Sequence, residues 1–113
     1  MRTATTRIIE RIAAQDVVIA SGSTTNSFTF RLPGLLRGIR YATNNNTNNV
    51  TTVITVVDDE SSTLYTSAAL NENTTGYLKP DVCLYNSNHT LVCTSADPGV
   101  STNIISITLL VER

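Results

Sequence analysis

The chain has 113 residues, the length of one domain, and only 15% of them are charged, whereas about a quarter are charged in a typical globular protein. Its net charge of −1 conceals an asymmetry: residues 1–43 carry six arginines and two carboxylates, and residues 44–113 carry two cations and seven carboxylates. The arginines are spread along the chain without a stacking set of aromatics, so we expect no nucleic-acid partner. No apolar run approaches the roughly 20 residues that span a bilayer, and no signal-peptide core is present. We therefore expect no membrane partner and synthesis in a cytoplasm.

Residues 1–14 are expected to form an extended N-terminal arm that precedes a single domain over residues 15–113. Ile8, Ile9 and Ile12 could line one face of a helical turn. Threonines at positions 3, 5 and 6 oppose a stable helix because β-branched side chains lose rotamer freedom there. Arg2, Arg7 and Arg11 make this arm basic. It is therefore suited to docking on an acidic neighbour or on another copy.

The rest of the chain alternates short runs of β-branched and aromatic residues with turns rich in Asn, Asp, Gly and Ser. The last run is the clearest, because Ile105, Ile107, Leu109 and Val111 occupy every second position. Such alternation is typical of a strand with one face in a core. The expected strands are residues 17–20, 27–32, 35–42, 50–57, 63–67, 77–85, 90–94 and 102–112. Regular spacing with turn signals predicts an all-β antiparallel sandwich, jelly-roll or immunoglobulin-like, of about eight strands.

One of these strands, residues 50–57, carries a further expectation. In residues 50–57, Val50, Ile54 and Val56 share one face while Val53 and Val57 share the other. Apolar residues on both faces predict a central strand whose outer side is covered by a partner.

Cys83 and Cys93 are predicted to flank a hairpin between residues 77–85 and 90–94. Pairing Leu84 with Leu91 turns Cys83 outward and Cys93 inward, and thiols on opposite faces cannot form a disulfide. We therefore predict free thiols, although a one-residue shift in the turn would place both on one face.

The residues that carry chemistry are few. His89 is the only histidine; we place it in the hairpin turn without a nucleophile beside it, so we expect no enzyme activity. Asp58, Asp59 and Glu60 could hold calcium, but three consecutive carboxylates more often form a solvated turn. We expect no metal and no cofactor. The absence of Trp reduces the case for a carbohydrate-binding platform without removing it.

Residues 34–113 resemble a known class of protein through the order of four segments. These are residues 34–41, 50–59, 74–80 and the ending from 95–100 through 109–112. The arrangement is similar to small β-sandwich structural proteins encoded among the head and tail genes of tailed bacteriophages, several of which decorate or cement the capsid.

The resemblance implies a structural virion protein on the capsid exterior, in contact with the major capsid protein and with other copies of itself, as a homotrimer. Arg2, Arg7, Arg11, Val53 and Val57 are then the expected interface residues. The alternative is a tail or baseplate protein or a receptor-binding module that binds glycan, and a secreted adhesin module is a more distant one.

Overall fold

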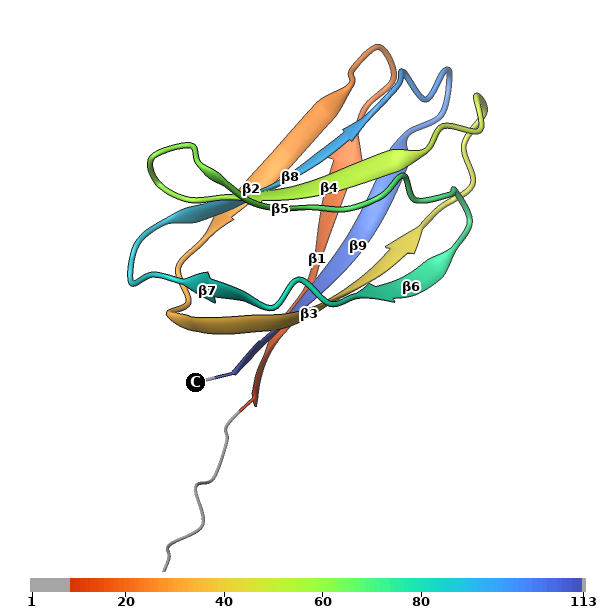
Figure 1. Ribbon diagram of the computed structural model, residues 1–113. Helices are drawn as coiled ribbons and strands as arrows, with labels where there is room; N and C mark the ends of the chain where they lie inside the picture. The colour runs from red at the N-terminus through yellow and green to blue at the C-terminus, as the bar shows by residue number, and fades with distance from the viewer. Residues whose placement is uncertain (1–8, 113) are drawn as a thin grey trace, which may run out of the picture.

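The computed structural model describes residues 9–112, with side chains from Gln15 onward, and within them the fold is an all-β sandwich of two antiparallel sheets (Figure 1). It has no helices in this range and no closed barrel. The strands are β1 (Ile9–Ile19), β2 (Thr25–Phe30), β3 (Gly34–Thr43), β4 (Thr52–Val57), β5 (Thr63–Thr66), β6 (Thr75–Leu78), β7 (Val82–Leu84), β8 (His89–Ser95) and β9 (Asn103–Glu112). The predicted fold class is confirmed.

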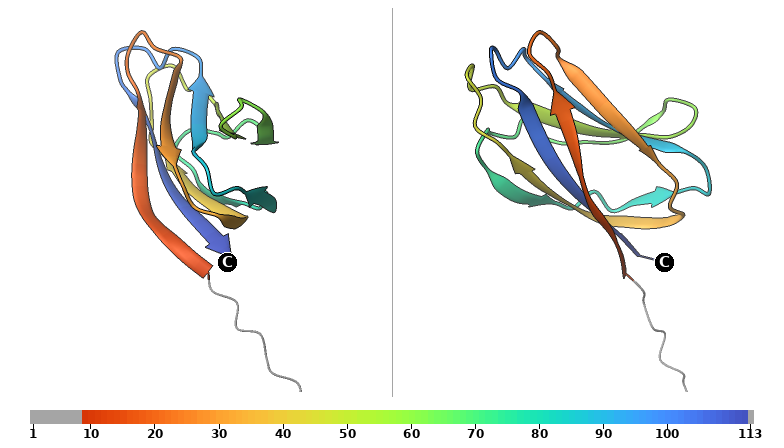
Figure 2. Two further views of the ribbon diagram at one scale, coloured as in Figure 1. Left: turned by 90° about the vertical axis from the view of Figure 1, so that its left-hand side faces the viewer. Right: turned by 180° about the vertical axis from the view of Figure 1, so that it is seen from behind.

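Sheet A has the strand order β1–β9–β3–β6, and β7 pairs with β3 beside β6. Sheet B has the order β2–β8–β4–β5. The two sheets face each other across the core, and side views show them as separate layers (Figure 2). Most connections cross from one sheet to the other, as in Greek-key sandwiches.

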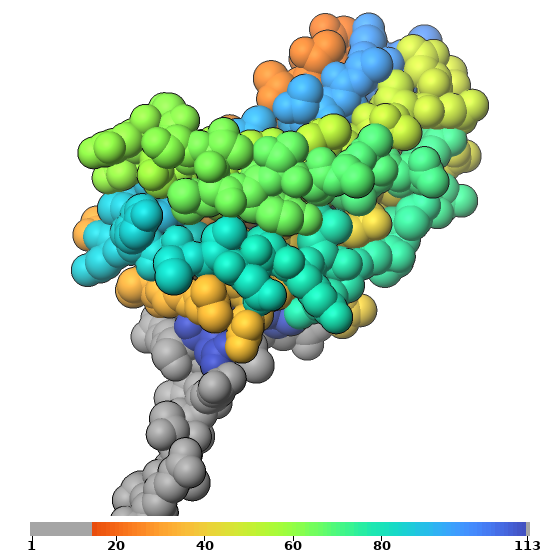
Figure 3. Space-filling view, viewed as in Figure 1, coloured from red at the N-terminus to blue at the C-terminus, as the bar shows by residue number. Residues whose placement is uncertain are grey.

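The core lies between the sheets and follows the predicted alternation. In β9 every second residue from Asn103 to Val111 is buried, and in β4 the same holds for Thr52, Ile54 and Val56. β4 is an inner strand of sheet B, as expected, with β8 on one side and β5 on the other. Side chains from the β5 and β6–β7 segments cover the front of the molecule (Figure 3).

Part of the predicted N-terminal arm is a strand, because β1 already begins at Ile9. Residues 9–12 pair with residues 109–112 of β9, so this part of the predicted arm belongs to sheet A. Burial of Val17 and Ile19 in the core anchors the strand, and backbone pairing then extends it toward the N-terminus. Arg2 and Arg7 lie outside the described residues.

The predicted hairpin around Cys83 and Cys93 is wrong. Residues 77–85 do not form one strand, because Pro80 cannot donate a backbone hydrogen bond and Asp81 has a φ of 50°. The segment becomes β6 and β7 in sheet A, whereas β8 lies in sheet B. Leu84 therefore pairs with Gly34, and Leu91 pairs with Phe28 and Val56.

Candidate functional site

The outer face of sheet B is the most distinctive surface of the described residues. On β2, β8 and β4 the side chains that point away from the core form three cross-strand rows. The rows are Thr25–Thr94–Val53, Ser27–Val92–Thr55 and Thr29–Thr90–Val57. We call these nine residues the threonine–valine face. None is charged, eight are β-branched, and all nine are exposed or half-buried.

This face suits contact with another protein for two physical reasons. Threonine and valine side chains are short and stiff at χ1, so little conformational entropy is lost when they are covered. The absence of charge also removes the largest desolvation cost of burying a surface. Adjacent strands and alternate residues put the outermost Cα atoms roughly 14 Å apart along a strand and about 10 Å apart across the three strands. A patch of this size is smaller than a standard interface, which buries about 800 Å² on each partner.

Two of the five predicted interface residues belong to this face. Val53 and Val57 lie on β4 at either side of Thr55, and both are half-buried. Arg11 lies in β1 opposite Leu110 and therefore in the sheet rather than in a free arm. The other seven residues of the face were not singled out in the sequence. Their alternation with core residues was visible, but the neighbourhood of β2, β8 and β4 depends on strand order, which alternation does not encode.

A shallow hollow of about 240 Å³ lies on the outer face of sheet A. It is lined by Arg40, Tyr41, Ala42, Thr75, Ser106 and Thr108. Ala42 forms its floor, since the short side chain is paired with Thr75 on one side and Ser106 on the other. Tyr77, 45% exposed, is the cross-strand neighbour of Arg40. Hydroxyls, a guanidinium and an aromatic ring are groups that bind polar ligands.

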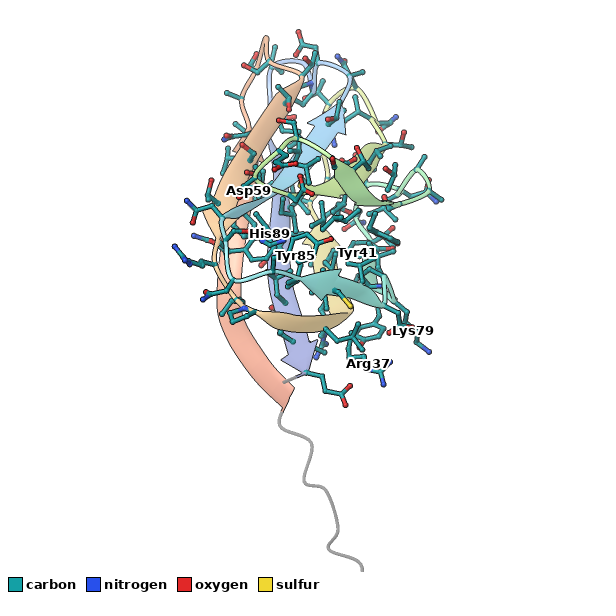
Figure 4. The ribbon with its side chains drawn as sticks, turned by 60° about the vertical axis from the view of Figure 1, so that its left-hand side comes forward. Arg37, Tyr41, Asp59, Lys79, Tyr85 and His89 are labelled. Carbon is teal, nitrogen blue, oxygen red and sulfur yellow. The ribbon has the colours of Figure 1, made fainter. Side chains whose placement is uncertain are left out.

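His89 is a structural residue of the β7–β8 connection. It begins β8, it is completely buried, and its ring stacks on Phe30 with centroids 5.8 Å apart. The Tyr85 backbone N–H donates to Nε2 at 3.3 Å, so Nδ1 carries the proton and donates to the Ser87 carbonyl at 2.9 Å. Figure 4 shows the ring pointing inward beside Tyr85. Both ring nitrogens are thus used by the backbone of one turn.

Of the three carboxylates considered for calcium, that of Asp58 is used in its own turn. Asp58 Oδ1 accepts hydrogen bonds from the backbone N–H groups of Glu60 and Ser62, at 3.0 and 2.8 Å. This is an Asx-type turn, which explains the acidic residue at its first position. Across residues with described side chains, no three His, Cys, Asp or Glu residues gather as a metal site would need. In the same part of the chain, no helix is long and apolar enough to cross a membrane.

A charged cluster of Arg37, Glu112 and Asp81 joins three segments of sheet A. Arg37 in β3 contacts Glu112 in β9 through Nε, and its Nη1 lies 3.1 Å from Asp81 before β7. The hydrogen bond to Glu112, followed by that to Asp81, raises the pKa of Arg37 above its ordinary value. Arg37 and Lys79 lie at the same end of the molecule (Figure 4). The cluster fixes the end of β9 against β3 and the β6–β7 turn.

The two cysteines are free, as predicted, and differ sharply in environment. Cys83 is exposed on β7, and Cys93 is buried in β8. Burial raises the pKa of the Cys93 thiol to about 12, so almost no reactive thiolate is present at neutral pH. We expect iodoacetamide at pH 8 to alkylate only Cys83 in the folded protein and both thiols in urea. Peptide mass spectrometry reads this out. Rapid native labelling of a Cys83→Ser variant would contradict it.

Asp97 connects two turns at one end of the sandwich. Its Oδ1 accepts from the backbone N–H groups of Gly99, at 3.0 Å, and Gly22, at 2.9 Å. These hydrogen bonds lower the pKa of Asp97 in the folded state, with that from Gly99 the larger cause. A carboxylate with a depressed folded pKa stabilises the fold above its unfolded pKa, and this contribution is lost as the pH falls through the folded pKa.

The Asp97→Asn variant tests this contribution of the carboxylate to stability. It should be less stable than the wild type near pH 7, and the difference should shrink as the pH falls below about 4, where the unfolded aspartate becomes protonated. Urea unfolding at a series of pH values measures the difference. Asp59→Asn is a suitable control, because the Asp59 side chain is exposed in a different turn. A stability difference independent of pH would refute the role of the charge.

Comparisons with known proteins identify the fold. The sequence matches no protein-family model and no curated protein. The structure is similar to part of the isomalto-dextranase of Arthrobacter globiformis T6, solved with panose, at a TM-score of 0.51 and 16% identity; the match covers 80% of this chain and 17% of that chain. It is also similar to a structure of infectious bursal disease virus, Gx strain, at a TM-score of 0.53 and 10% identity, covering 98% of this chain and 34% of that chain.

The chain thus spans about a third or less of the length of these two proteins. One of them is an enzyme and the other is viral, so the likeness does not discriminate between functions. What the comparisons establish is a shared β-sandwich.

Proposed function

We propose that this protein is a structural component of a virion that decorates or cements the capsid exterior of a tailed bacteriophage. In this proposal it acts through protein–protein contacts and catalyses no reaction. Its partners are the major capsid protein and other copies of itself, and its location is the capsid surface. The observation that carries the proposal is the charge-free threonine–valine face on a rigid sandwich.

A face of this kind suits many weak contacts repeated over a lattice. A neutral, flat surface of stiff side chains can be covered at low cost, but its area alone supports modest affinity. On a lattice, a protein bound through several such patches gains effective concentration at every further contact. One further feature supports the proposal, namely the resemblance of residues 34–113 to phage structural proteins.

The proposal is tested by binding to capsids assembled from the major capsid protein of the same genome. Val92 is the centre of the threonine–valine face, between Ser27 and Thr55. Val92→Lys buries an unpaired charge in the contact and is expected to weaken cosedimentation at least about tenfold, or about 1.4 kcal/mol.

Two controls separate this effect from misfolding and from charge in general. Val92→Thr keeps the β-branched shape and should bind within a few-fold of the wild type. Val100→Lys makes the same substitution at a position that is 90% exposed, in the turn before β9, and should bind normally. Circular dichroism and thermal unfolding establish that each variant folds. Wild-type protein that does not bind capsids would refute the proposal, and normal binding of Val92→Lys would exclude this face.

A second candidate function is favoured by the hollow on sheet A. Arg40, the surrounding hydroxyls and exposed Tyr77 form a surface that a receptor-binding module could use for glycan. Such a module predicts signals on a glycan array that disappear in Arg40→Ala and Tyr77→Ala. The number of copies in each virus particle also separates the two functions, because decoration requires many copies and a tail or baseplate protein only a few.

A further inference from the structure

The edge of sheet A formed by β1 is long and open. β1 has 11 residues, whereas β2, β5, β6 and β7 at the other sheet edges have between three and six. Among the described strands, β1 pairs only with β9. β2 leaves the turn after β1 and diverges from it, so the rest of the edge stands at the side of the molecule (Figure 2). Natural proteins usually shorten or cover such an edge, because unpaired backbone groups recruit another strand.

The backbone groups that face this open edge can be identified near the end of β1. Val18 is opposite Ile104. Both backbone groups of Ile104 bond to Asn44 on the β3 side, its N–H to Oδ1 at 2.8 Å and its carbonyl to the Asn44 N–H at 3.2 Å. Val18 and Ile104 are therefore a non-bonded pair, and the Val18 carbonyl instead accepts from Asn26 Nδ2 at 2.8 Å. Because the pattern alternates, Asp16 and Val18 both present their backbone groups to the open edge.

A shift in register between β1 and β9 changes which residues of β1 turn their backbone groups to the open edge. Ile12 is opposite Leu109 and Gln15 is opposite Ile107, so β1 contains one extra residue between these pairs. Beyond the shift, the residues of β9 whose backbone groups turn away from β1 are Leu110 and Glu112, which continue the alternation from Ile104. Their partners in β1 are Arg11 and Ile9. The groups facing the open edge are therefore those of Ile9 and Arg11 before the shift and of Asp16 and Val18 after it.

We infer that this edge pairs with the same edge of a second copy, antiparallel and about a twofold axis. In one twofold register, the edge-facing residues before the shift in one copy lie opposite the edge-facing residues after the shift in the other copy. Arg11 is then opposite Asp16, and Ile9 is opposite Val18. Symmetry repeats each pair, so the dimer has four pairs of opposed residues. Two of them oppose unlike charges and two oppose apolar residues, both of which stabilise a sheet. The axis passes between Ala13 and Ala14, so the register shift of one copy lies opposite that of the other.

The contact of Asn26 is consistent with this pairing. Its side-chain amide lies where the backbone N–H of a partner strand would lie, and it covers the end of the edge in the single chain. The Asn26 side chain is exposed, so it can turn aside and leave the Val18 carbonyl to the N–H of the partner strand. The inference concerns the chain alone and does not rest on the proposed role in a virion.

Sedimentation equilibrium tests the dimer and charge reversal tests its register. The wild type is expected to show twice the mass of one chain, and Arg11→Asp or Asp16→Arg should each raise the dimer dissociation constant at least about tenfold. Combining both substitutions restores unlike charges at every pair and should restore the dimer. Lys79→Asp, at an exposed position between β6 and β7, is the control for charge reversal and should leave the dimer unchanged. Circular dichroism verifies the fold of each variant.

Cross-linking tests the register directly. Opposed residues in a hydrogen-bonded antiparallel pair have Cα atoms about 5.5 Å apart, within the range of a disulfide. In a Cys83→Ser background, Arg11→Cys and Asp16→Cys proteins should cross-link when mixed and oxidised, and neither should cross-link alone. The inference would be overturned if the protein stayed monomeric up to roughly 1 mM and its β1 edge instead bound an extended peptide. A trimer, a double charge reversal that does not restore the dimer, or cross-linking of either cysteine variant by itself would also overturn it.

Discussion

Leu109→Ala is expected to lower the free energy of unfolding by about 3 kcal/mol, within the usual range for truncating a buried leucine. Leu109 is 1% exposed at the centre of the core. It lies in β9, opposite Ile12 of β1 and Ile39 of β3. Its removal leaves a cavity between three strands whose hydrogen bonds prevent collapse. Urea denaturation followed by circular dichroism measures the loss.

The neighbouring residue provides a matched control. Leu110 is the same amino acid in the same strand, but it is half-buried on the outer face of sheet A. Leu110→Ala removes the same atoms with little cavity formation and should cost about 1 kcal/mol or less. Equal losses in the two variants would contradict the assignment of the core face of β9.

Gly34→Ala is expected to lower the free energy of unfolding by about 2 kcal/mol or more. Gly34 begins β3 with a φ of 144°, which L-residues rarely adopt. An added Cβ would lie 2.6 Å from the Glu112 carbonyl oxygen and 2.9 Å from Val111 Cγ1. The first contact is with backbone, so the ends of β3 and β9 must separate to relieve it. Thermal and urea unfolding of the variant measure the cost.

Gly22→Ala separates backbone strain from this steric clash. Gly22 also has a positive φ, 84°, but an added Cβ would meet nothing within 4 Å. It should therefore cost only the conformational strain, about 1 kcal/mol. If Gly34→Ala were no worse than Gly22→Ala, the close packing of β3 against β9 would be refuted.

The sandwich could be predicted from the sequence because its core uses strict alternation. The alternation within residues 105–111 and within residues 50–57 indicates which face of each strand is buried, even when the neighbouring strands are not known. The break in residues 77–85 was harder to predict: Pro80 was visible, but the positive φ of Asp81 and the assignment of β7 to sheet A depend on pairing with residues 34–36. The predicted orientations of Cys83 and Cys93 were correct although the hairpin was not, because each follows from the alternation within its own strand.

The candidate surfaces were less predictable than the fold. Val53 and Val57 were found because apolar residues on both faces of one strand are unusual. The rest of the threonine–valine face consists of residues that look like ordinary solvent-facing strand positions, and only the order β2–β8–β4 makes them one patch. The open edge of β1 likewise depends on topology, since it results from the pairing of the first described strand with the last.

That pairing also governs when the protein can fold during synthesis. β9 lies between β1 and β3 in sheet A, so the centre of this layer leaves the ribosome after the other eight described strands. Until then β1 and β3 have no common partner, and their apolar faces must remain apart while about 60 further residues beyond β3 are made. Contacts between such distant segments also make folding slow. A nascent chain stalled before residue 103 should therefore be sensitive to protease, and emergence of residues 103–112 from the ribosome should be the step that confers resistance.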